Sequence, residues 1–356
     1  MTKKLLKLGL CTGGGDCPGL NAAIRAVVTT AAKSHGIQVV GIKSGLTGLL
    51  HPESVKNLTV PDVDGILELG GTILGTNNQG SPFRDPIQAA TTLAAIQKNW
   101  RRLKLDGMIV IGGDGTQFMA KRLSASGLNI IGIPKTIDND LMGTDQTIGF
   151  ATAVDIATEA ACRLRTSAAA HDRIMILEVM GRDGGHIALA TALASGADAV
   201  LIPEIPFASD VLLTHVKQRQ KKGRNHYLVV VAEGCTTVGG EQLYSAANGN
   251  AKVLGGMGQY VASVLHAGTG RDVRVAVLGH IQRGGSPNAD DRILAAMMGV
   301  RATQMAIDGD YGSIVGVRGG KLTTIPYKTL THKRRAIRLD DPRIVAAEAM
   351  NICLGR

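Results

Sequence analysis

The stretch Ile133–Asp140, with the sequence IPKTIDND, carries the residue types that phosphoryl transfer requires. Asp138 and Asp140 follow a short apolar run, and Lys135 and Thr136 stand just before them. Transfer of a phosphoryl group needs a base for the attacking hydroxyl, ligands for a metal ion and cations that compensate negative charge. One aspartate as the base and the other near Mg²⁺ fit those needs. An Asx-turn followed by a helix cap uses the same residues, so the stretch alone leaves both interpretations open.

A glycine-rich turn at residues 11–19, CTGGGDCPG, lies between a predicted strand and a predicted helix. A glycine turn that opens a helix offers unpaired N–H groups and the positive end of the helix dipole to a phosphate. The GxxxxGK(S/T) spacing of a P-loop is absent, and Pro18 stands where the dinucleotide motif GxGxxG needs its third glycine. We therefore expect a phosphate-binding turn, with a tight turn without ligand as the alternative, and disfavour a nicotinamide dinucleotide.

A third candidate loop follows another predicted strand, at residues 111–117, IGGDGTQ. Its glycines let the backbone approach a polyanion, and Asp114 can then hold Mg²⁺ against the polyanion's oxygens, because hard cations prefer carboxylate ligands. A plain N-cap aspartate is the alternative, but a cap alone would not need three flanking glycines. We expect this loop to bind the phosphates of a nucleotide.

Three further loops after predicted strands carry polar residues suited to phosphate or sugar. Arg182 lies in EVMGRDGGH, His280 and Arg283 lie in VLGHIQRGGSPNADDR, and Glu233 follows the strand in VVVAEG. The planar guanidinium fork of arginine suits phosphate oxygens, and a glutamate can accept a hydrogen bond from a sugar hydroxyl. Each residue alone is more typical of a surface charge or a cap, but together with the loops above they place polar residues suited to phosphate or sugar after several strands.

The elements that must position these loops are short apolar strands that alternate with longer helical patterns. Such alternation predicts βαβ units in two mainly parallel sheets of an α/β fold. Ligands of such folds bind at the carboxyl ends of the strands. We expect strands at 7–12, 37–42, 107–111, 129–133, 174–179, 199–202, 227–231 and 273–278, helices at 87–98, 147–165, 185–195, 209–222, 256–266 and 288–306, and two more helices, one opening at Pro18 and ending before Gly36, the other running from the GGDGT loop to about Ser124.

Composition narrows the class of ligand. The chain has 356 residues, enough for two domains, and at 44% hydrophobic it can bury a full core, although aromatic residues make up only 3%. Lys and Arg exceed Asp and Glu by 39 − 29 = 10. A nucleic-acid surface usually brings stacking aromatics, so this surplus favours phosphorylated small molecules over nucleic acid.

Cysteine usage and the N-terminus indicate the compartment. The five cysteines, at positions 11, 17, 162, 235 and 353, form no CxxC pair, which argues against a disulfide framework or a zinc site and favours buried thiols in a reducing cytosol. The opening MTKKLLKLGL is too short and too interrupted by lysine for a signal peptide, and no segment approaches a membrane span. We expect a cytoplasmic protein without a nucleic-acid or membrane partner.

Taken in order, these motifs resemble those of the 6-phosphofructokinase family. They span roughly residues 5–305 and comprise TGGGDCPGLNAAIR, GGTILGT, IGGDGT, PKTIDND, QTIGFATA, EVMGRDGGHIAL and VLGHIQRGGSPNADDR. The resemblance implies two doubly wound, mainly parallel three-layer αβα domains with the active site between them. It also implies transfer of the γ-phosphoryl group of Mg-ATP to the 1-hydroxyl of fructose 6-phosphate, giving fructose 1,6-bisphosphate and ADP in glycolysis.

The resemblance also implies roles for individual residues. Its catalytic set is Lys135, Thr136, Asp138, Asp140 and Arg182, in which Asp138 is the base, Asp140 supports the metal region and Arg182 is a cation over the transferred group. The implied nucleotide contacts are Gly14, Asn78, Gly113, Asp114 as the Mg²⁺ ligand, Gly115 and Thr116. The implied sugar-phosphate contacts are Thr136, Ile137, Asp138, Arg173, Met180, Gly181, Arg182, Glu233, Arg274, His280, Ile281, Gln282 and Arg283.

The same resemblance implies a division of the chain and an assembly. Residues 1–149 plus 282–333 match a phosphoryl-donor domain, and residues 150–281 plus 334–356 match a sugar-phosphate domain. Arg173 and Arg274 match arginines that reach the 6-phosphate from a neighbouring subunit. A homotetramer with shared sites is therefore implied.

One departure from the family pattern concerns the phosphoryl donor. Lys135 stands where ATP-using bacterial members usually carry glycine and pyrophosphate-using members carry lysine. Gly115, by contrast, is the ATP-type residue, where pyrophosphate enzymes place an aspartate that would crowd and repel the α-phosphate region of a nucleotide. We therefore favour ATP, with Lys135 adding positive charge near the transferred phosphate, and keep the pyrophosphate-dependent enzyme as the alternative.

A second departure lies in the loop GTNNQGSPFRD. It lacks the arginine that many members place near its start, where this chain has Asn77 and Asn78, and Arg84 comes some residues later. Lys135 can take over part of the missing positive charge.

The usual effector site of this allosteric family is matched only in part. Arg25 and the basic segment Lys222–Arg224 match, but Thr29 stands where a second arginine is common. Control by nucleoside diphosphate or phosphoenolpyruvate is therefore in doubt.

Two readings from other classes also stay open. A non-catalytic sugar-phosphate sensor with the same fold would be expected to lose its base or its metal ligand, but Asp138 and Asp114 are both present. A kinase of NAD or lipid shares the GGDGT motif, but the HIQRGG and MGR motifs argue against it.

Overall fold

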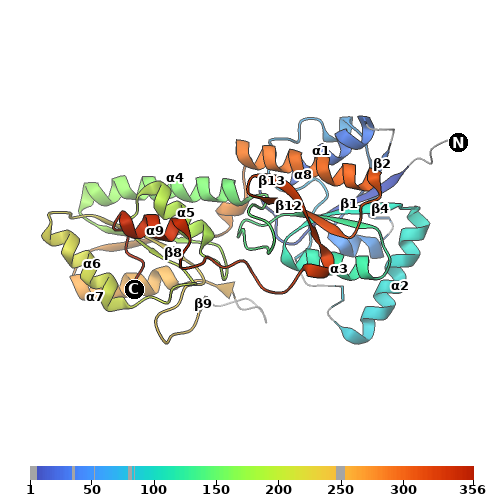
Figure 1. Cartoon of the computed structure of the whole chain (residues 1–356). Helices are drawn as coiled ribbons and strands as arrows, with labels where there is room; N and C mark the ends of the chain where they lie inside the picture. Colours follow the sequence, from blue (N-terminus) through green and yellow to red (C-terminus); the bar gives the residue numbers. More distant parts are fainter. Residues whose placement is uncertain (1–5, 34–36, 52, 79–81, 84, 246–252) are drawn as a thin grey trace. The chain divides into compact units, whose positions relative to one another are not determined.

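The computed structural model describes residues 6–33, 37–51, 53–78, 82–83, 85–245 and 253–356. Contacts divide the chain into two compact units, each built from separate stretches of sequence (Figure 1). Unit 1 comprises Met1–Ile137, Leu141–Thr152 and Arg283–Lys333, and unit 2 comprises Asp138–Asp140, Ala153–Gln282 and Arg334–Arg356. The three residues Asp138–Asp140 thus make most of their contacts in a different unit from the residues on either side of them.

Unit 1 is built on a seven-stranded sheet in the order β13-β12-β5-β4-β1-β2-β3. The five inner strands from β12 to β2 run parallel, and each edge strand is antiparallel to its neighbour. The strands are β1 (Lys7–Gly13), β2 (Gln38–Ile42), β3 (Val55–Leu58), β4 (Gly107–Gly112), β5 (Ile130–Pro134), β12 (Ser313–Arg318) and β13 (Lys321–Pro326). The central strands β4 and β5 are buried at every residue, as expected for parallel strands covered on both faces.

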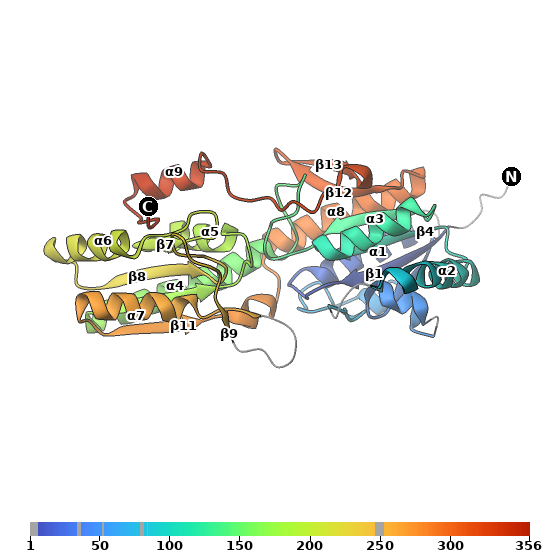
Figure 2. The ribbon, with the colours of Figure 1, turned by 90° about the horizontal axis from the view of Figure 1, so that it is seen from below.

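Helices cover both faces of this sheet (Figures 1 and 2). Buried residues of α2 (Pro86–Leu103) and α3 (Asp114–Ala125) join one hydrophobic cluster with strand residues, while α1 (Leu20–Lys33) packs beside α8 (Ala289–Asp308). Local sequence sets where these helices begin. Asp85 caps α2 by accepting a hydrogen bond from the backbone N–H of Ile87, and Asn288 caps α8 by accepting one from Asp291.

A buried carboxylate fixes the beginning of α4 (Phe150–His171), just after the IPKTIDND loop. Asp291 of α8 is fully buried and accepts hydrogen bonds from the backbone N–H groups of Gly149 and Thr152, at 2.7 and 2.8 Å, and from the hydroxyl of Thr152 at 2.5 Å. Burial raises the pKa of Asp291, while these hydrogen bonds act to lower it. The carboxylate thereby ties the end of that loop to α8.

Unit 2 is built on a four-stranded parallel sheet in the order β11-β6-β8-β7, and α9 is its C-terminal helix. In Figure 1, α6 and α7 lie on one face of this sheet and α4 and α5 on the other. Alternate residues such as Ile174 and Ile176 pack against α6 and α7 in one cluster. The elements are β6 (Ile174–Val179), β7 (Ala199–Leu201), β8 (Tyr227–Ala232), β11 (Val273–Val277), α5 (His186–Ser195), α6 (Ser209–Lys221), α7 (Met257–Thr269) and α9 (Pro342–Ala349).

Shorter elements complete the described chain. An antiparallel pair is formed by β9 (Tyr244–Ser245) and β10 (Val253–Leu254), and four 3₁₀ turns are η1 (Gly45–Leu50), η2 (Pro61–Val63), η3 (Gly279–Arg283) and η4 (Tyr327–Thr329).

The predicted α/β class and the two mainly parallel sheets are confirmed, but several details differ. The helix expected from Thr147 begins at Phe150, because the Thr147 hydroxyl donates to the Thr136 carbonyl at 2.6 Å and Ile148 bridges to Lys135. The antiparallel edge strands were not expected, and Gly36 lies outside the described residues.

The expectation that the cysteines are buried holds for only some of them. All five thiols are free, and Cys162, on α4, is exposed. Among the described residues, no helix is both long and apolar enough to cross a membrane.

Candidate active site

Three of the sequence-predicted loops follow the carboxyl ends of three adjacent strands in the unit 1 sheet. Gly13, the last residue of β1, pairs with Gly112 of β4, and Gly112 pairs with Pro134 of β5. The glycine turn, the IGGDGT loop and the IPKT loop therefore start side by side at the carboxyl ends of parallel strands. In open α/β sheets this edge is where ligands bind.

The glycine turn is shaped by close approach of its neighbours. Gly14 has a φ of +79°, in the left-handed region that favours glycine. Its N–H donates to the Asn77 carbonyl at 3.2 Å, and its carbonyl accepts from the Thr76 hydroxyl at 2.5 Å. A Cβ at Gly13 would lie 2.8 Å from Thr116 Cγ2, so this position has no room for a side chain.

Lys135 belongs to the same cluster as the glycine turn. Its side chain is buried, and its ammonium group donates a hydrogen bond to the carbonyl oxygen of Gly15. Its backbone N–H donates to the Gly112 carbonyl at 3.1 Å, which fixes the start of the loop. The ammonium group therefore lies beside the candidate phosphate-binding turn.

Asp114 stands at the N-terminus of α3, where the helix dipole and free N–H groups favour an anion. It is half-buried and follows Gly113, the N-cap residue. No group of three or more His, Cys, Asp or Glu side chains among the described residues could hold a metal ion. One protein carboxylate completed by phosphate oxygens and water is nevertheless a common way to bind Mg²⁺, and Asp114 fits that role.

The remaining nucleotide candidates differ in how much space surrounds them. A Cβ at Gly115 would meet no protein atom within 4 Å, whereas a Cβ at Gly113 would lie 3.1 Å from the Lys135 carbonyl. Asn78 is exposed, next to the Asn77 carbonyl that holds Gly14, and Arg84 lies outside the described residues. Packing against the described residues therefore gives no reason for a glycine at position 115.

In unit 2, the loop after β6 is held by two side chains from other loops. The backbone N–H of Met180 donates to the buried side chain of Gln282 at 2.8 Å, and that of Arg182 donates to Glu233 at 3.0 Å. Arg182 has a φ of +53°, which is unusual outside glycine and marks a constrained backbone. Burial raises the pKa of Glu233, and the negative charge of Asp138 adds to that effect.

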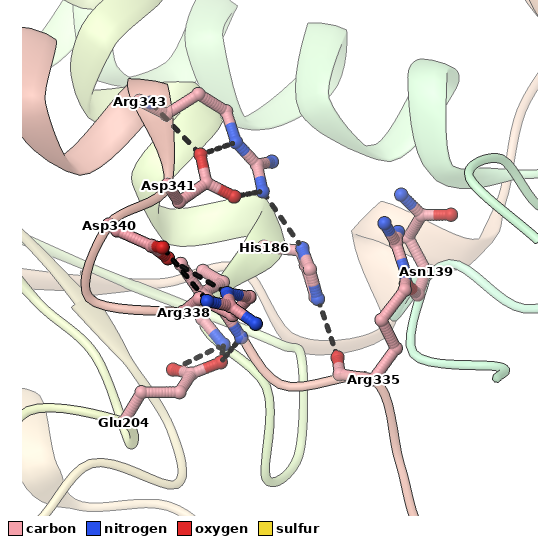
Figure 3. A network of polar contacts seen from close by, with 10 residues as sticks. Asn139, His186, Glu204, Arg335, Arg338, Asp340, Asp341 and Arg343 are labelled. Atoms are coloured by element: carbon pink, nitrogen blue, oxygen red, sulfur yellow. Dashed lines mark hydrogen bonds and ion pairs between the residues drawn. The ribbon is translucent and has the colours of Figure 1, made fainter. Parts of the chain in front are cut away.

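The Asp138–Asp140 turn also belongs to unit 2. All three of its residues are buried, and Asn139 has a φ of +50°. Asparagine is one of the few residues that adopt this left-handed conformation at low cost. Figure 3 shows that Arg335, from the C-terminal segment, reaches this turn at Asn139.

The four candidates of the HIQR motif differ in burial and in the unit to which they belong. His280 and Ile281 are exposed on η3 of unit 2, while Gln282 is fully buried. Arg283 belongs to unit 1, where its guanidinium group donates to the Asp16 carbonyl at 3.2 Å. Of this motif, Arg283 therefore lies against the glycine turn in the structure.

Arg173 and Arg274 lie together at the amino ends of strands of the unit 2 sheet. Both pair with Asp272, at 2.6 and 2.7 Å respectively. Arg173 precedes β6 and Arg274 is near the start of β11, whereas Met180 and Glu233 follow the carboxyl ends of their strands. A six-residue strand spans about 20 Å, so residues at the amino ends and at the carboxyl ends of the strands are too far apart to contact the same small ligand.

A family model described as Phosphofructokinase matches residues 7–306. The chain belongs to the phosphofructokinase family. It is 45% identical to the ATP-dependent 6-phosphofructokinase of Chloroflexus aggregans, over 100% of this chain and 99% of that protein. It is also 42% identical to the pyrophosphate–fructose 6-phosphate 1-phosphotransferase of Amycolatopsis methanolica, over 93% of this chain and 96% of that protein. Both donor types thus occur among similar family members.

A solved structure of the family confirms the fold. Phosphofructokinase from Pichia pastoris in the T-state is similar with a TM-score of 0.82 and 30% identity, over 99% of this chain and 37% of that chain. The α/β architecture with two units, predicted from the strand and helix patterns, is therefore the architecture of this family.

Sequence reasoning missed several residues that hold the candidate site of this family member. Asp272 pairs with both Arg173 and Arg274, and Arg335 reaches the Asp138–Asp140 turn. Neither Asp272 nor Arg335 lies in a loop that follows the carboxyl end of a predicted strand. A basic segment, HKRRAIR, was visible in the C-terminal region but carried no spacing typical of a site.

Proposed function

We propose that this family member transfers the γ-phosphoryl group of Mg-ATP to the 1-hydroxyl of fructose 6-phosphate, giving fructose 1,6-bisphosphate and ADP. One observation carries the proposal. The three loops that match donor and acceptor motifs follow the carboxyl ends of adjacent parallel strands. Lys135, in the third of these loops, donates a hydrogen bond to the glycine turn, which is the first. Relatives of nearly full length that carry this activity in their names support it.

On the donor side, each feature of unit 1 has a role in holding a polyphosphate. The N–H groups of the glycine turn and the N-terminus of α3 bind phosphate oxygens, and Lys135 compensates their charge. Asp114 would hold Mg²⁺, which neutralises charge on the phosphates when it is bound. Preorganised groups of this kind are the main source of catalysis in phosphoryl transfer.

On the acceptor side, Asp138 takes the proton of the attacking hydroxyl. Its buried turn is supported by the left-handed Asn139, and the carboxylate contributes to raising the pKa of Glu233. Glu233, which follows β8, can accept a hydrogen bond from a sugar hydroxyl. Arg182, whose backbone Glu233 holds, supplies a cation for the transferred group.

ATP is the proposed donor because of Gly115. Its surroundings leave open space rather than a packing reason for glycine, and a helix N-terminus would tolerate an aspartate. A nucleotide that approaches this position is a reason for glycine. Lys135 and the relative from Amycolatopsis methanolica favour pyrophosphate as the second candidate donor.

A donor assay tests the proposal. The purified protein is incubated with fructose 6-phosphate and Mg²⁺, with either ATP or pyrophosphate, and fructose 1,6-bisphosphate is quantified. We expect turnover with ATP. Turnover with pyrophosphate alone would overturn the donor, and no product with either donor would overturn the reaction.

We also propose that the active assembly is a homotetramer in the cytoplasm, with sites shared between subunits. Arg173 and Arg274 lie about 20 Å from the Met180 and Glu233 edge of their own sheet. This distance supports the proposal that they bind the sugar 6-phosphate of a neighbouring subunit rather than that of their own.

A further inference from the structure

The C-terminal segment Arg334–Ile337 belongs to unit 2 and lies on the turn that carries the proposed base (Figure 3). The guanidinium group of Arg335 donates to the carbonyl oxygen of Asn139 through Nη2 at 2.7 Å and Nε at 3.2 Å. The backbone N–H of Arg335 donates to the next carbonyl, that of Asp140, at 2.7 Å. One residue therefore binds two consecutive peptide groups of a three-residue turn.

The conformation of the turn fixes the direction of the carbonyl groups that Arg335 binds. Asn139 has a φ of +50°, and its two neighbours are buried carboxylates. Hydrogen bonds from a charged group are stronger than those between neutral groups. A guanidinium group on the Asn139 carbonyl thus favours this conformation over others in which that carbonyl would turn away.

The segment that carries Arg335 is itself fixed from behind. The Arg335 carbonyl accepts a hydrogen bond from Nε2 of the buried His186 at 2.8 Å, and Arg343 donates to Nδ1 of His186 at 3.4 Å. Two residues on, the Ile337 N–H donates to Glu204 at 3.0 Å, and Glu204 also accepts from the Gly185 N–H. The segment is therefore held to the beginning of α5, a rigid element of the fold.

Arg334 extends these contacts to a second proposed catalytic loop. Its guanidinium group lies 3.6 Å from the carboxylate of Asp140 and pairs with the carboxylate of Asp183. Asp183 directly follows Arg182, which is also in the left-handed region. The same short segment thus contacts both the turn of the proposed base and the loop of the proposed cation.

We infer that Arg335 is a positioning residue, which sets the Asp138 carboxylate for proton abstraction by clamping the Asn139 and Asp140 carbonyls. This inference rests on the proposed function of Asp138. Displacement of a reacting group by about 1 Å can cost about 10² in rate, so loss of the clamp should act mainly on turnover. Substrate affinity is expected to change less, because Arg335 is not assigned to either substrate.

The test compares Arg335→Ala, Arg335→Lys and the control Arg338→Ala in assays of fructose 6-phosphate with ATP. Arg338 directly follows this segment, but its side chain is 82% exposed and, among the described residues, forms an ion pair only with Asp340. We expect Arg335→Ala to lower kcat by about 10- to 100-fold, with each KM changed less than threefold, about 0.6 kcal/mol. Arg338→Ala should retain wild-type kcat.

Two further measurements separate positioning from a purely structural role. Millimolar guanidinium chloride, far below denaturing concentrations, should restore part of the kcat of Arg335→Ala but not change that of the wild type. Arg335→Lys, which keeps the charge but loses the planar fork, should remain impaired. Arg335→Lys also serves as the test variant if Arg335→Ala does not fold.

The outcomes distinguish this inference from the proposed function. Wild-type turnover with undiminished kcat in Arg335→Ala, or in Arg335→Lys if only that variant folds, would overturn the positioning role alone. If Arg335→Ala has a lower kcat that guanidinium does not restore, and its thermal midpoint is also below that of the wild type, then Arg335 contributes to stability and the positioning role is likewise overturned. If the wild type uses only pyrophosphate, the same ratios are measured with pyrophosphate. A wild type inactive with both donors overturns the inference together with the proposed function.

Discussion

Lys135 donates a hydrogen bond to the carbonyl oxygen of Gly15, 120 positions earlier in the chain. The two residues come from loops after β5 and β1, which are both neighbours of β4 in the sheet. This contact gives a buried positive charge a fixed place beside the glycine turn. The ammonium group of Lys135 therefore lies with the proposed phosphate-binding elements.

Replacement of Lys135 by methionine tests that role. Lys135→Met keeps the length of the side chain but removes its charge, and we expect kcat/KM for ATP to fall by about 10- to 100-fold, since hydrogen bonds from charged groups contribute ~1.5–3 kcal/mol. Lys121→Met is a matched control, because Lys121 also donates to a backbone carbonyl, that of Leu330, at 2.7 Å. Equal losses of kcat/KM in both variants would contradict a specific role for Lys135.

Removal of the proposed base should stop the reaction without preventing nucleotide binding. Asp138→Asn keeps the size of a buried side chain but cannot take a proton, so we expect kcat to fall by at least about 10². Binding of ATP, followed by calorimetry, should persist. Asp210→Asn, an exposed carboxylate on α6, serves as the control and should leave kcat unchanged. Near-normal turnover of Asp138→Asn would remove the residue from its role.

Gly115→Asp tests the choice of donor. Because a Cβ there meets no protein atom within 4 Å, we expect the fold to accept the side chain and ATP to be repelled. A carboxylate about 4 Å from a phosphate oxygen opposes it by up to ~4 kcal/mol, so KM for ATP should rise at least about tenfold. Gly115→Asn has the same size without the charge and should have a smaller effect. Unchanged ATP kinetics in Gly115→Asp would leave ATP without its main structural support.

Arg274→Ala tests the sharing of sites between subunits. We expect KM for fructose 6-phosphate to rise about 10- to 100-fold, because a charged contact is lost, while KM for ATP changes little. Equal weakening of both substrates would contradict a contact with the 6-phosphate.

Complementation gives the second part of that test. Coexpression of Arg274→Ala with Asp138→Asn places an intact Asp138 and an intact Arg274 from different chains in some sites. If the chains mix at random across a two-fold interface, about a quarter of the sites regain activity. Activity no higher than the sum of the separate variants would mean that each chain uses its own arginine.

The pH dependence of stability should report on His186. Burial, followed by the charges of Arg335 and Arg343, lowers the pKa of this histidine from 6.5 to about 4. The unfolded chain therefore binds a proton more readily than the folded chain between pH 6.5 and about 4, and the free energy of unfolding falls as the pH falls through that window.

A non-titrating variant isolates this contribution. His186→Gln can still donate to the Arg335 carbonyl, so the difference in stability between wild type and variant should change by about 3 kcal/mol between pH 7 and pH 4. Urea unfolding at several pH values measures it. A difference that stays constant with pH would contradict the assignment of His186 as a buried neutral histidine.

Structural features that depend on consecutive residues were predicted correctly, whereas features that depend on contacts between distant residues were not. The strand Ile174–Val179 was predicted with its observed bounds, because a short apolar run is a local signal. The beginning of α4 was wrong, because Thr147 and Ile148 are used by contacts with the loop of Lys135 and Thr136. The antiparallel edges β3 and β13 were missed, since edge pairing depends on neighbours rather than on local pattern.

The sequence by itself determined the α/β class, the loops that follow the parallel strands and the family. Apolar periodicity and glycine-rich motifs are local patterns of neighbouring residues, so they can be recognised without the structure. Only the tertiary structure decided how those loops are held. Lys135 binds Gly15 across 120 positions, Arg335 binds Asn139 across 196, and Arg173 meets Asp272 across 99. Hydrogen bonds between groups so far apart in the chain form only after the sheets bring them together, so no local pattern can specify them.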